Sequence, residues 1–182
     1  LFNEGLFDLA VKCFRRSGDN LREKWAQAAG LCATADRIIS VDYNVGQTAL
    51  RNAADIYESI GKPELAASCF LKLGDFEAAG MIYLNKCEAS KLEAAGDCFV
   101  KAKRLFLAAE AYAKGNCFSK CLSCCTTGGH FDLGLKYLEQ WRTGSQSKHP
   151  MLRKMEDIKI TYLKNCAQHC HSAGDHNHMM AL

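Results

Sequence analysis

The apolar positions of the chain repeat at a fixed spacing. From Tyr57 to Leu138 the anchor of the pattern, in most copies a large apolar side chain, recurs every 13 residues, with one step of 16 residues. A small residue stands four positions before each anchor, and an apolar residue stands seven positions before it. Offsets of −7, −4 and 0 lie on one face of an α-helix, so the pattern predicts a series of short helices that pack through the same face. The anchors are Phe14, Tyr57, Phe70, Tyr83, Phe99, Tyr112, Cys125 and Leu138. The small residues are Ala10, Ala53, Ala66, Ala79, Ala95, Ala108, Cys121 and Gly134.

Turn residues separate the predicted helices. Pro63 falls in a first helical turn, where its missing N–H group costs nothing. A 13-residue step leaves about ten helical residues and a tight turn, and helices this short are stable only when they pack together. The sequence therefore predicts an all-α fold, an α-solenoid of short antiparallel helical hairpins similar to a tetratricopeptide (TPR-like) superhelix. Five glycines follow an anchor by three or four residues, where we expect left-handed C-terminal caps: Gly18, Gly61, Gly74, Gly115 and Gly128.

Two parts of the chain depart from the 13-residue step. Between the anchors at 14 and 57 the pattern predicts longer helices, one over about 20–40 and one over about 44–61. The first of these has Asp19 or Asn20 as its N-terminal cap.

The second departure is the stretch 143–149, which has no apolar member and predicts a polar loop. We assign residues 1–142 to the helical-repeat array and residues 150–182 to a C-terminal helix followed by the start of a further segment. Because the chain begins inside the pattern without an initiator Met, we expect it to be a piece of a longer protein.

Composition narrows the class of protein. The 182 residues include 23 Lys and Arg against 20 Asp and Glu, a net charge of +3, which is too weak to indicate nucleic-acid binding by itself. Apolar residues make up 48% and charged residues 24%, ordinary values for a globular protein. No apolar run approaches the roughly 20 residues needed to span a bilayer, so we expect no membrane association.

Eleven cysteines occur in the chain, an odd number, with no secretory signal at the N-terminus. This favours free thiols in an intracellular reducing compartment, the nucleus or the cytoplasm. The pair Cys121 and Cys124 has the spacing of zinc ligands, and Cys166 and Cys170 could supply a second pair. The alternative is packing, because many cysteines fall on the positions of the repeat and act there as small buried apolar groups. We favour packing, and predict no cofactor in this segment. The cysteines directly before an anchor are Cys13, Cys69, Cys98 and Cys124.

Basic residues recur just after the anchors and form a candidate basic ridge. If the repeat aligns them, they could contact phosphates or an acidic partner. Cations in a last helical turn are favoured in any case, because they oppose the helix dipole. The ridge comprises Arg15, Arg16, Lys72, Lys101, Lys103, Arg104 and Lys114.

Catalytic motifs are missing from the sequence. It contains no glycine-rich phosphate loop, no GxSxG nucleophile motif and no HExxH zinc motif. We therefore predict no enzyme activity and no small-molecule substrate for this segment.

The alanine–aromatic segments carry a family resemblance. They include Leu65-Ala-Ala-Ser-Cys-Phe70, Gly74-Asp-Phe-Glu-Ala-Ala79 and Leu92-Glu-Ala-Ala-Gly-Asp-Cys-Phe99. These resemble the helical, TPR-like region of large plant proteins of the UvrD/Rep-like helicase type, often called TPR and ankyrin repeat-containing proteins. The resemblance implies an ATP-dependent helicase core elsewhere in the parent protein. None of the family's nucleotide-binding residues lies within this chain.

These observations lead to one expected function and two alternatives. The expected function is a non-catalytic scaffold that binds a partner protein, as an accessory region of a larger helicase-like protein. The first alternative is a domain that contacts nucleic acid through the basic ridge and assists the parent helicase. The second is a zinc-stabilised module.

Overall fold

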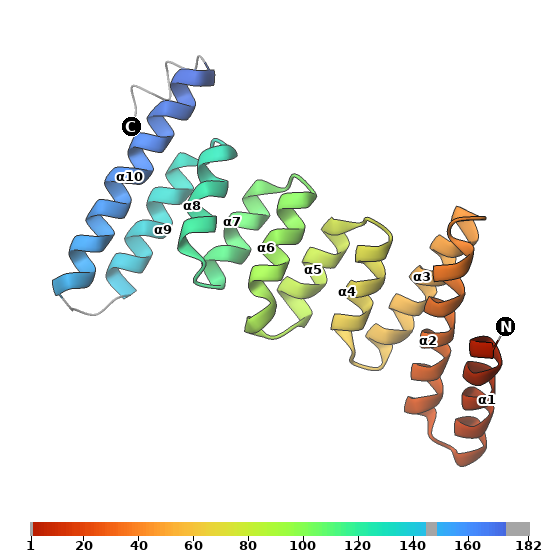
Figure 1. The fold of residues 1–182 in the computed structure, drawn as a ribbon. Helices are drawn as coiled ribbons and strands as arrows, with labels where there is room; N and C mark the ends of the chain where they lie inside the picture. Colours follow the sequence, from red (N-terminus) through yellow and green to blue (C-terminus); the bar gives the residue numbers. More distant parts are fainter. Residues whose placement is uncertain (1, 145–148, 174–182) are drawn as a thin grey trace. The chain divides into compact units, whose positions relative to one another are not determined.

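The computed structural model describes residues 2–144 and 149–173. Within them the chain forms ten α-helices and one short 3₁₀ helix, and no strand (Figure 1). The chain divides into two compact units, Leu1–Ala102 and Lys103–Leu182. The fold is therefore all-α, as predicted, and within each unit consecutive helices pack against each other.

The first unit contains six helices and the 3₁₀ helix. Each α-helix lies beside the next one along the chain, from α1 on α2 to α5 on α6. Their bounds are α1 Phe2–Ser17, α2 Asn20–Ile38, α3 Tyr43–Ser59, α4 Pro63–Lys72, α5 Phe76–Lys86, η1 Ala89–Lys91 and α6 Leu92–Lys101.

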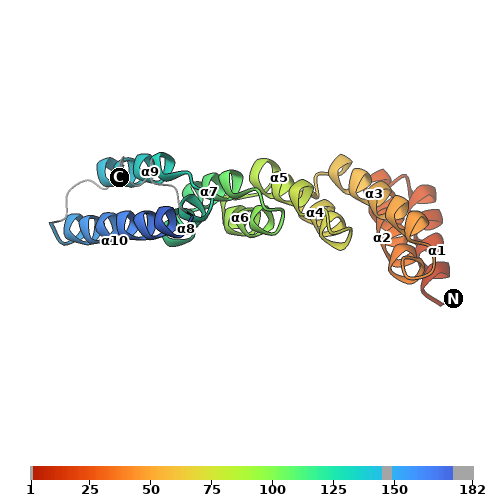
Figure 2. The same ribbon diagram turned by 90° about the horizontal axis from the view of Figure 1, so that it is seen from above.

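The described part of the second unit contains four helices. Here α7 packs on α8, and α10 lies against both α8 and α9 (Figure 2). The contact of α10 with α8 joins two helices that are not consecutive in the chain. Their bounds are α7 Leu105–Lys114, α8 Phe118–Thr127, α9 Phe131–Gly144 and α10 His149–Ala173.

The predicted register of the repeat is confirmed by burial. The small residues from Ala53 to Cys121 are fully buried, and Gly134 is buried as well. Their anchors are buried or half-buried in every helix. Ala10 in α1 is only half-buried. A second buried position, three residues before the anchor, was not predicted, and it too holds mostly small residues: Ala54, Ala67, Gly80, Gly96, Ala109 and Leu122.

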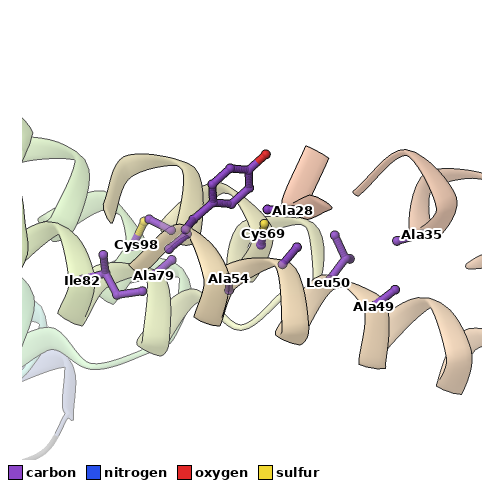
Figure 3. Packing of buried hydrophobic residues seen from close by; sticks show 13 residues of the cluster. Ala28, Ala35, Ala49, Leu50, Ala54, Cys69, Ala79, Ile82 and Cys98 are labelled. Carbon is purple, nitrogen blue, oxygen red and sulfur yellow. The ribbon is translucent and has the colours of Figure 1, made fainter. Parts of the chain in front are cut away.

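The core of the first unit is built from small side chains (Figure 3). Alanines such as Ala28, Ala54 and Ala79 meet Cys69, Cys98 and the larger Leu50 and Ile82 in one cluster. Small residues allow helix backbones to approach closely, so helices of about ten residues gain enough contact to be stable. Cys13 departs from this pattern. It is exposed rather than buried, because α1 packs mainly on α2 and leaves this side of the helix uncovered.

The left-handed caps are displaced from two of the predicted glycines. Gly18, Gly61 and Gly74 have the expected positive φ values of 72°, 68° and 73°. Gly115 and Gly128 have negative φ values, and the next residues, Asn116 and Gly129, take the left-handed conformation instead. Lys103 has the same conformation, with a φ of 59°. In each case the left-handed residue follows its anchor by four positions, so the anchor fixes the turn.

Hydrogen bonds close five of these turns, those that follow Phe14, Tyr57, Phe70, Tyr112 and Cys125, in the same way. The N–H group five residues after the anchor donates to the anchor's carbonyl oxygen, as from Lys62 to Tyr57 at 2.9 Å and from Cys117 to Tyr112 at 2.8 Å. This is the Schellman arrangement, which satisfies a carbonyl group at the helix end.

The departures from the 13-residue step have structural causes. The longer helices are α2 and α3, and the Asp19 side chain accepts a hydrogen bond from the Arg22 N–H group at 3.0 Å as the predicted cap. The 16-residue step between Tyr83 and Phe99 accommodates η1. In the predicted loop 143–149, the first two residues continue α9 and His149 begins α10. The rest of that loop and the end of the predicted segment 150–182, from residue 174, lie outside the described residues.

Candidate functional site

A groove of about 1020 Å³ runs between α8 and α10 in the second unit. Side chains at helical spacing line it from both sides, so each helix presents one continuous face to it. From α8 these are Phe118, Ser119, Leu122, Ser123, Thr126 and Thr127. From α10 they are Asp157, Ile158, Thr161, Tyr162, Asn165, Gln168, His169 and Ser172.

The position of α10 beside this groove is fixed by Tyr162. Its hydroxyl group donates a hydrogen bond to the Phe131 carbonyl oxygen in α9 at 3.1 Å, and its ring is almost fully buried. The ring packs onto Gly134, where a Cβ atom would lie 2.0 Å from the Tyr162 oxygen. Burial raises the pKa of Tyr162, so the hydroxyl keeps its proton and remains a donor.

The lining of the groove combines apolar contact with uncharged polar groups. Leu122 and Ile158 supply apolar surface, and hydroxyl and amide side chains surround them. Several hydroxyls donate to carbonyls of their own helix, as Thr126 does to Leu122 at 3.0 Å, and keep their lone pairs available as acceptors. No lysine or arginine belongs to the described lining, and Asp157 is its one carboxylate. Such a surface suits a protein segment with apolar side chains better than a phosphate backbone.

The four cysteines considered as zinc ligands lie in the same two helices. Cys121 and Cys124 belong to α8, Cys166 and Cys170 to α10, and all four are buried. A hydrogen bond to Cys125, together with burial, raises the pKa of Cys121. Among the side chains that the structure describes, no group of three or more His, Cys, Asp or Glu is arranged to hold a metal ion.

The seven residues of the candidate basic ridge lie at helix ends or in turns, and most have partners close by. Lys72 lies 2.7 Å from Asp36, and Lys114 lies 2.8 Å from Glu110. Arg15 pairs with Glu23 at 2.8 Å. The Lys101 ammonium group stands 5.3 Å from the centre of the Phe76 ring. These contacts balance or cover the charges locally and reduce the positive potential that a phosphate would meet. Arg16, Lys103 and Arg104 are exposed.

A pair of thiols in the first unit was not predicted as a site. The sulfur atoms of Cys32 in α2 and Cys69 in α4 lie 3.5 Å apart, although the residues are 37 positions apart in the chain. The repeat predicts that Cys69 is buried in the core. Because α2 lies outside the 13-residue series, the sequence pattern does not predict that Cys32 contacts Cys69.

Comparison of the chain with protein-family models, with curated proteins and with solved structures found no match.

No helix in the described part of the chain combines the length and apolar character needed to cross a membrane. All eleven cysteines lie in the described part of the chain, and each of them is a free thiol.

Proposed function

We propose that this chain is a non-catalytic scaffold that binds a segment of a partner protein in the groove between α8 and α10. In this proposal the packed helices form an α-solenoid of short antiparallel hairpins in the TPR-like manner. Solenoids bind partners on surfaces lined by non-consecutive helices, and α8 and α10 are such a pair. The groove is the observation that carries the proposal.

The chemistry of the lining defines the partner segment. Leu122 and Ile158 favour one or two large apolar side chains, and the surrounding hydroxyl and amide groups favour uncharged polar ones. Asp157 disfavours an acidic segment and accommodates a single basic residue. We expect an amphipathic segment anchored by apolar side chains.

The place of this scaffold in a larger ATP-dependent helicase-like protein is supported by the sequence resemblance alone. A reducing compartment, the nucleus or the cytoplasm, is supported by the free thiols.

The test is a pull-down experiment that compares which proteins bind to the parent chain and to two variants of it. Ser123 is exposed in the groove, so Ser123→Arg places a long charged side chain there without disturbing the core. Gln140 is exposed on α9 and does not line the groove, so Gln140→Arg adds the same charge elsewhere as the matched control. The proposal expects a specific protein retained by the parent chain and by Gln140→Arg but lost with Ser123→Arg, by at least about tenfold.

A nucleic-acid titration distinguishes the alternative function. Labelled duplex and single-stranded DNA are titrated with the same three proteins over a range of salt concentrations. Tight binding that weakens steeply with salt and is unchanged by Ser123→Arg would support the basic ridge instead and would refute the groove as the principal site.

A further inference from the structure

The pair Cys32 and Cys69 has the geometry of two thiols that can react with each other. Their sulfur atoms, 3.5 Å apart, share a hydrogen bond. A disulfide bond is about 2.05 Å long, so the sulfurs need to approach by only about 1.5 Å. Cys69 is almost fully buried in the core cluster (Figure 3), whereas Cys32 is partly exposed at its edge. A small reagent therefore meets Cys32 first.

The surroundings of the pair distinguish the two thiols. The hydrogen bond with Cys69 lowers the pKa of Cys32 to about 7, against the opposing effect of burial. The positive charge of Lys72 lowers this pKa further, Asp36 raises it, and the Tyr57 hydroxyl group in α3 lowers it. The same hydrogen bond, together with burial, raises the pKa of Cys69. Cys32 is therefore deprotonated more readily than Cys69 near neutral pH.

We propose that Cys32 and Cys69 form a peroxide-responsive site, in which Cys32 is oxidised and Cys69 then joins it in a disulfide between α2 and α4. The Cys32 thiolate attacks one oxygen of hydrogen peroxide, the O–O bond breaks, and hydroxide leaves and takes up a proton to become water. Cys69 loses its proton and attacks the sulfur of the resulting sulfenic acid, whose S–O bond breaks to release a second water. Two thiols are oxidised to one disulfide, and one peroxide is reduced to two waters.

The other cysteines provide a contrast within the same chain. Cys121 and Cys125 also share a hydrogen bond, but both are fully buried in α8, so peroxide does not reach them in the folded protein. Cys13 is exposed in α1, so peroxide can oxidise it. No contact of Cys13 with a second thiol is seen in the described residues, so we expect no disulfide within the chain at this position.

The disulfide has a structural consequence. It closes a loop that contains all of α3, so it restricts the unfolded chain and holds α2, α3 and α4 together. We expect the melting temperature of the first unit to rise by about 5 °C or more on oxidation.

The experiment uses the full chain with Cys13→Ser, which removes the one fully exposed cysteine and so reduces disulfide formation between molecules. The reduced protein is treated with hydrogen peroxide near pH 7 and digested under non-reducing conditions for mass spectrometry. The expected product is a peptide pair joined through Cys32 and Cys69, together with the rise in melting temperature. In Cys69→Ser, a sulfenic acid at Cys32 should be trapped by dimedone. In Cys32→Ser, Cys69 should remain a thiol.

A second measurement separates this site from general thiol oxidation. Lys72→Gln removes the cation and leaves Asp36 beside Cys32, so peroxide should oxidise Cys32 at least about twofold more slowly at pH 7. Oxidation of the exposed Cys13 in the parent chain shows that the peroxide treatment works. If this treatment oxidises Cys13 but yields no peptide pair joined through Cys32 and Cys69, the proposal is overturned. It is also overturned if the pair forms equally fast in the urea-unfolded chain, because the folded geometry would then contribute nothing.

Discussion

Gly80 offers the sharpest test of how α5 and α6 pack together. It is buried in α5, three residues before the anchor Tyr83, and faces the ring of Phe99 in α6. A Cβ atom at this position would lie 2.9 Å from Cε1, 3.0 Å from Cδ1 and 3.1 Å from Cζ of that ring. Real Cβ atoms rarely approach other atoms so closely, and the Phe99 ring is fully buried.

The expected effect of Gly80→Ala is the difference between two opposing contributions. Alanine favours a helix interior over glycine by about 1 kcal/mol. Overpacking a buried contact costs about 1–3 kcal/mol, and the ring meets the new methyl group with three atoms at once. The difference is a net loss of up to about 2 kcal/mol in the free energy of unfolding, measured by urea denaturation.

The same substitution elsewhere in the unit should have the opposite sign. Gly5 lies in α1, and a Cβ atom there would have no neighbour within 4 Å. Gly5→Ala should therefore stabilise the protein by about 0.5–1 kcal/mol.

A double mutant identifies the ring as the cause. Phe99→Leu shortens the side chain facing Gly80, so adding Gly80→Ala to Phe99→Leu should be less destabilising than adding it to the parent chain by about 1 kcal/mol. If Gly80→Ala raises the urea midpoint as Gly5→Ala does, the close packing of α5 on α6 described above is wrong.

Three further substitutions test other parts of the fold by the same urea assay. Gly134→Ala should cost about 2–4 kcal/mol, because the methyl group would displace the Tyr162 hydroxyl, and Tyr162→Phe in that background should recover part of the loss. Asn116→Gly should stabilise by about 0.5–1 kcal/mol by relieving a left-handed conformation, and a lower midpoint would contradict the turn. Ala79→Leu should cost about 1–3 kcal/mol, whereas Met81→Leu, exposed on the same helix, should change stability by less than about 0.5 kcal/mol; equal midpoints would refute the packing register.

The repeat register could be predicted from the sequence because the −7, −4 and 0 positions have distinct side-chain sizes. The second small position, three residues before the anchor, was missed although Ala54 and Gly80 are visible in the sequence. A helix inside an array contacts a neighbour on each side, so its buried surface is wider than a single stripe. A search for one amphipathic face finds only part of that surface.

The turns show what residue type alone does not determine. Glycine is the preferred residue for a left-handed cap, so the sequence predicts caps at Gly115 and Gly128. The structure places the cap four residues after the anchor, at Asn116 and Gly129. The length of the helix, fixed by packing of the anchor, decides where the chain turns, and Asn tolerates the left-handed conformation better than most residues.

The candidate sites depend on contacts between residues far apart in the chain, which a repeat pattern does not encode. The pairing of Lys72 with Asp36 joins α4 to α2, as the contact of Cys69 with Cys32 does. Both α2 partners lie in a helix outside the 13-residue series, so their rotation relative to α4 follows from tertiary packing alone.

The groove between α8 and α10 lies where the repeat loses its aromatic anchor. In α8 the anchor position holds Cys125 and the small position holds Cys121, and both are fully buried. Tyr162 of α10 lies close enough to both thiols for them to raise its pKa, although burial has the larger effect. The Tyr162 ring thus lies near the positions of α8 at which thiols replace the alanine and the aromatic residue of the earlier repeats. The contact of α10 with α8 joins helices that are not neighbours in the chain, and the groove lies between these two helices. The candidate binding surface thus lies beside the helix in which the sequence pattern first lacks its aromatic anchor.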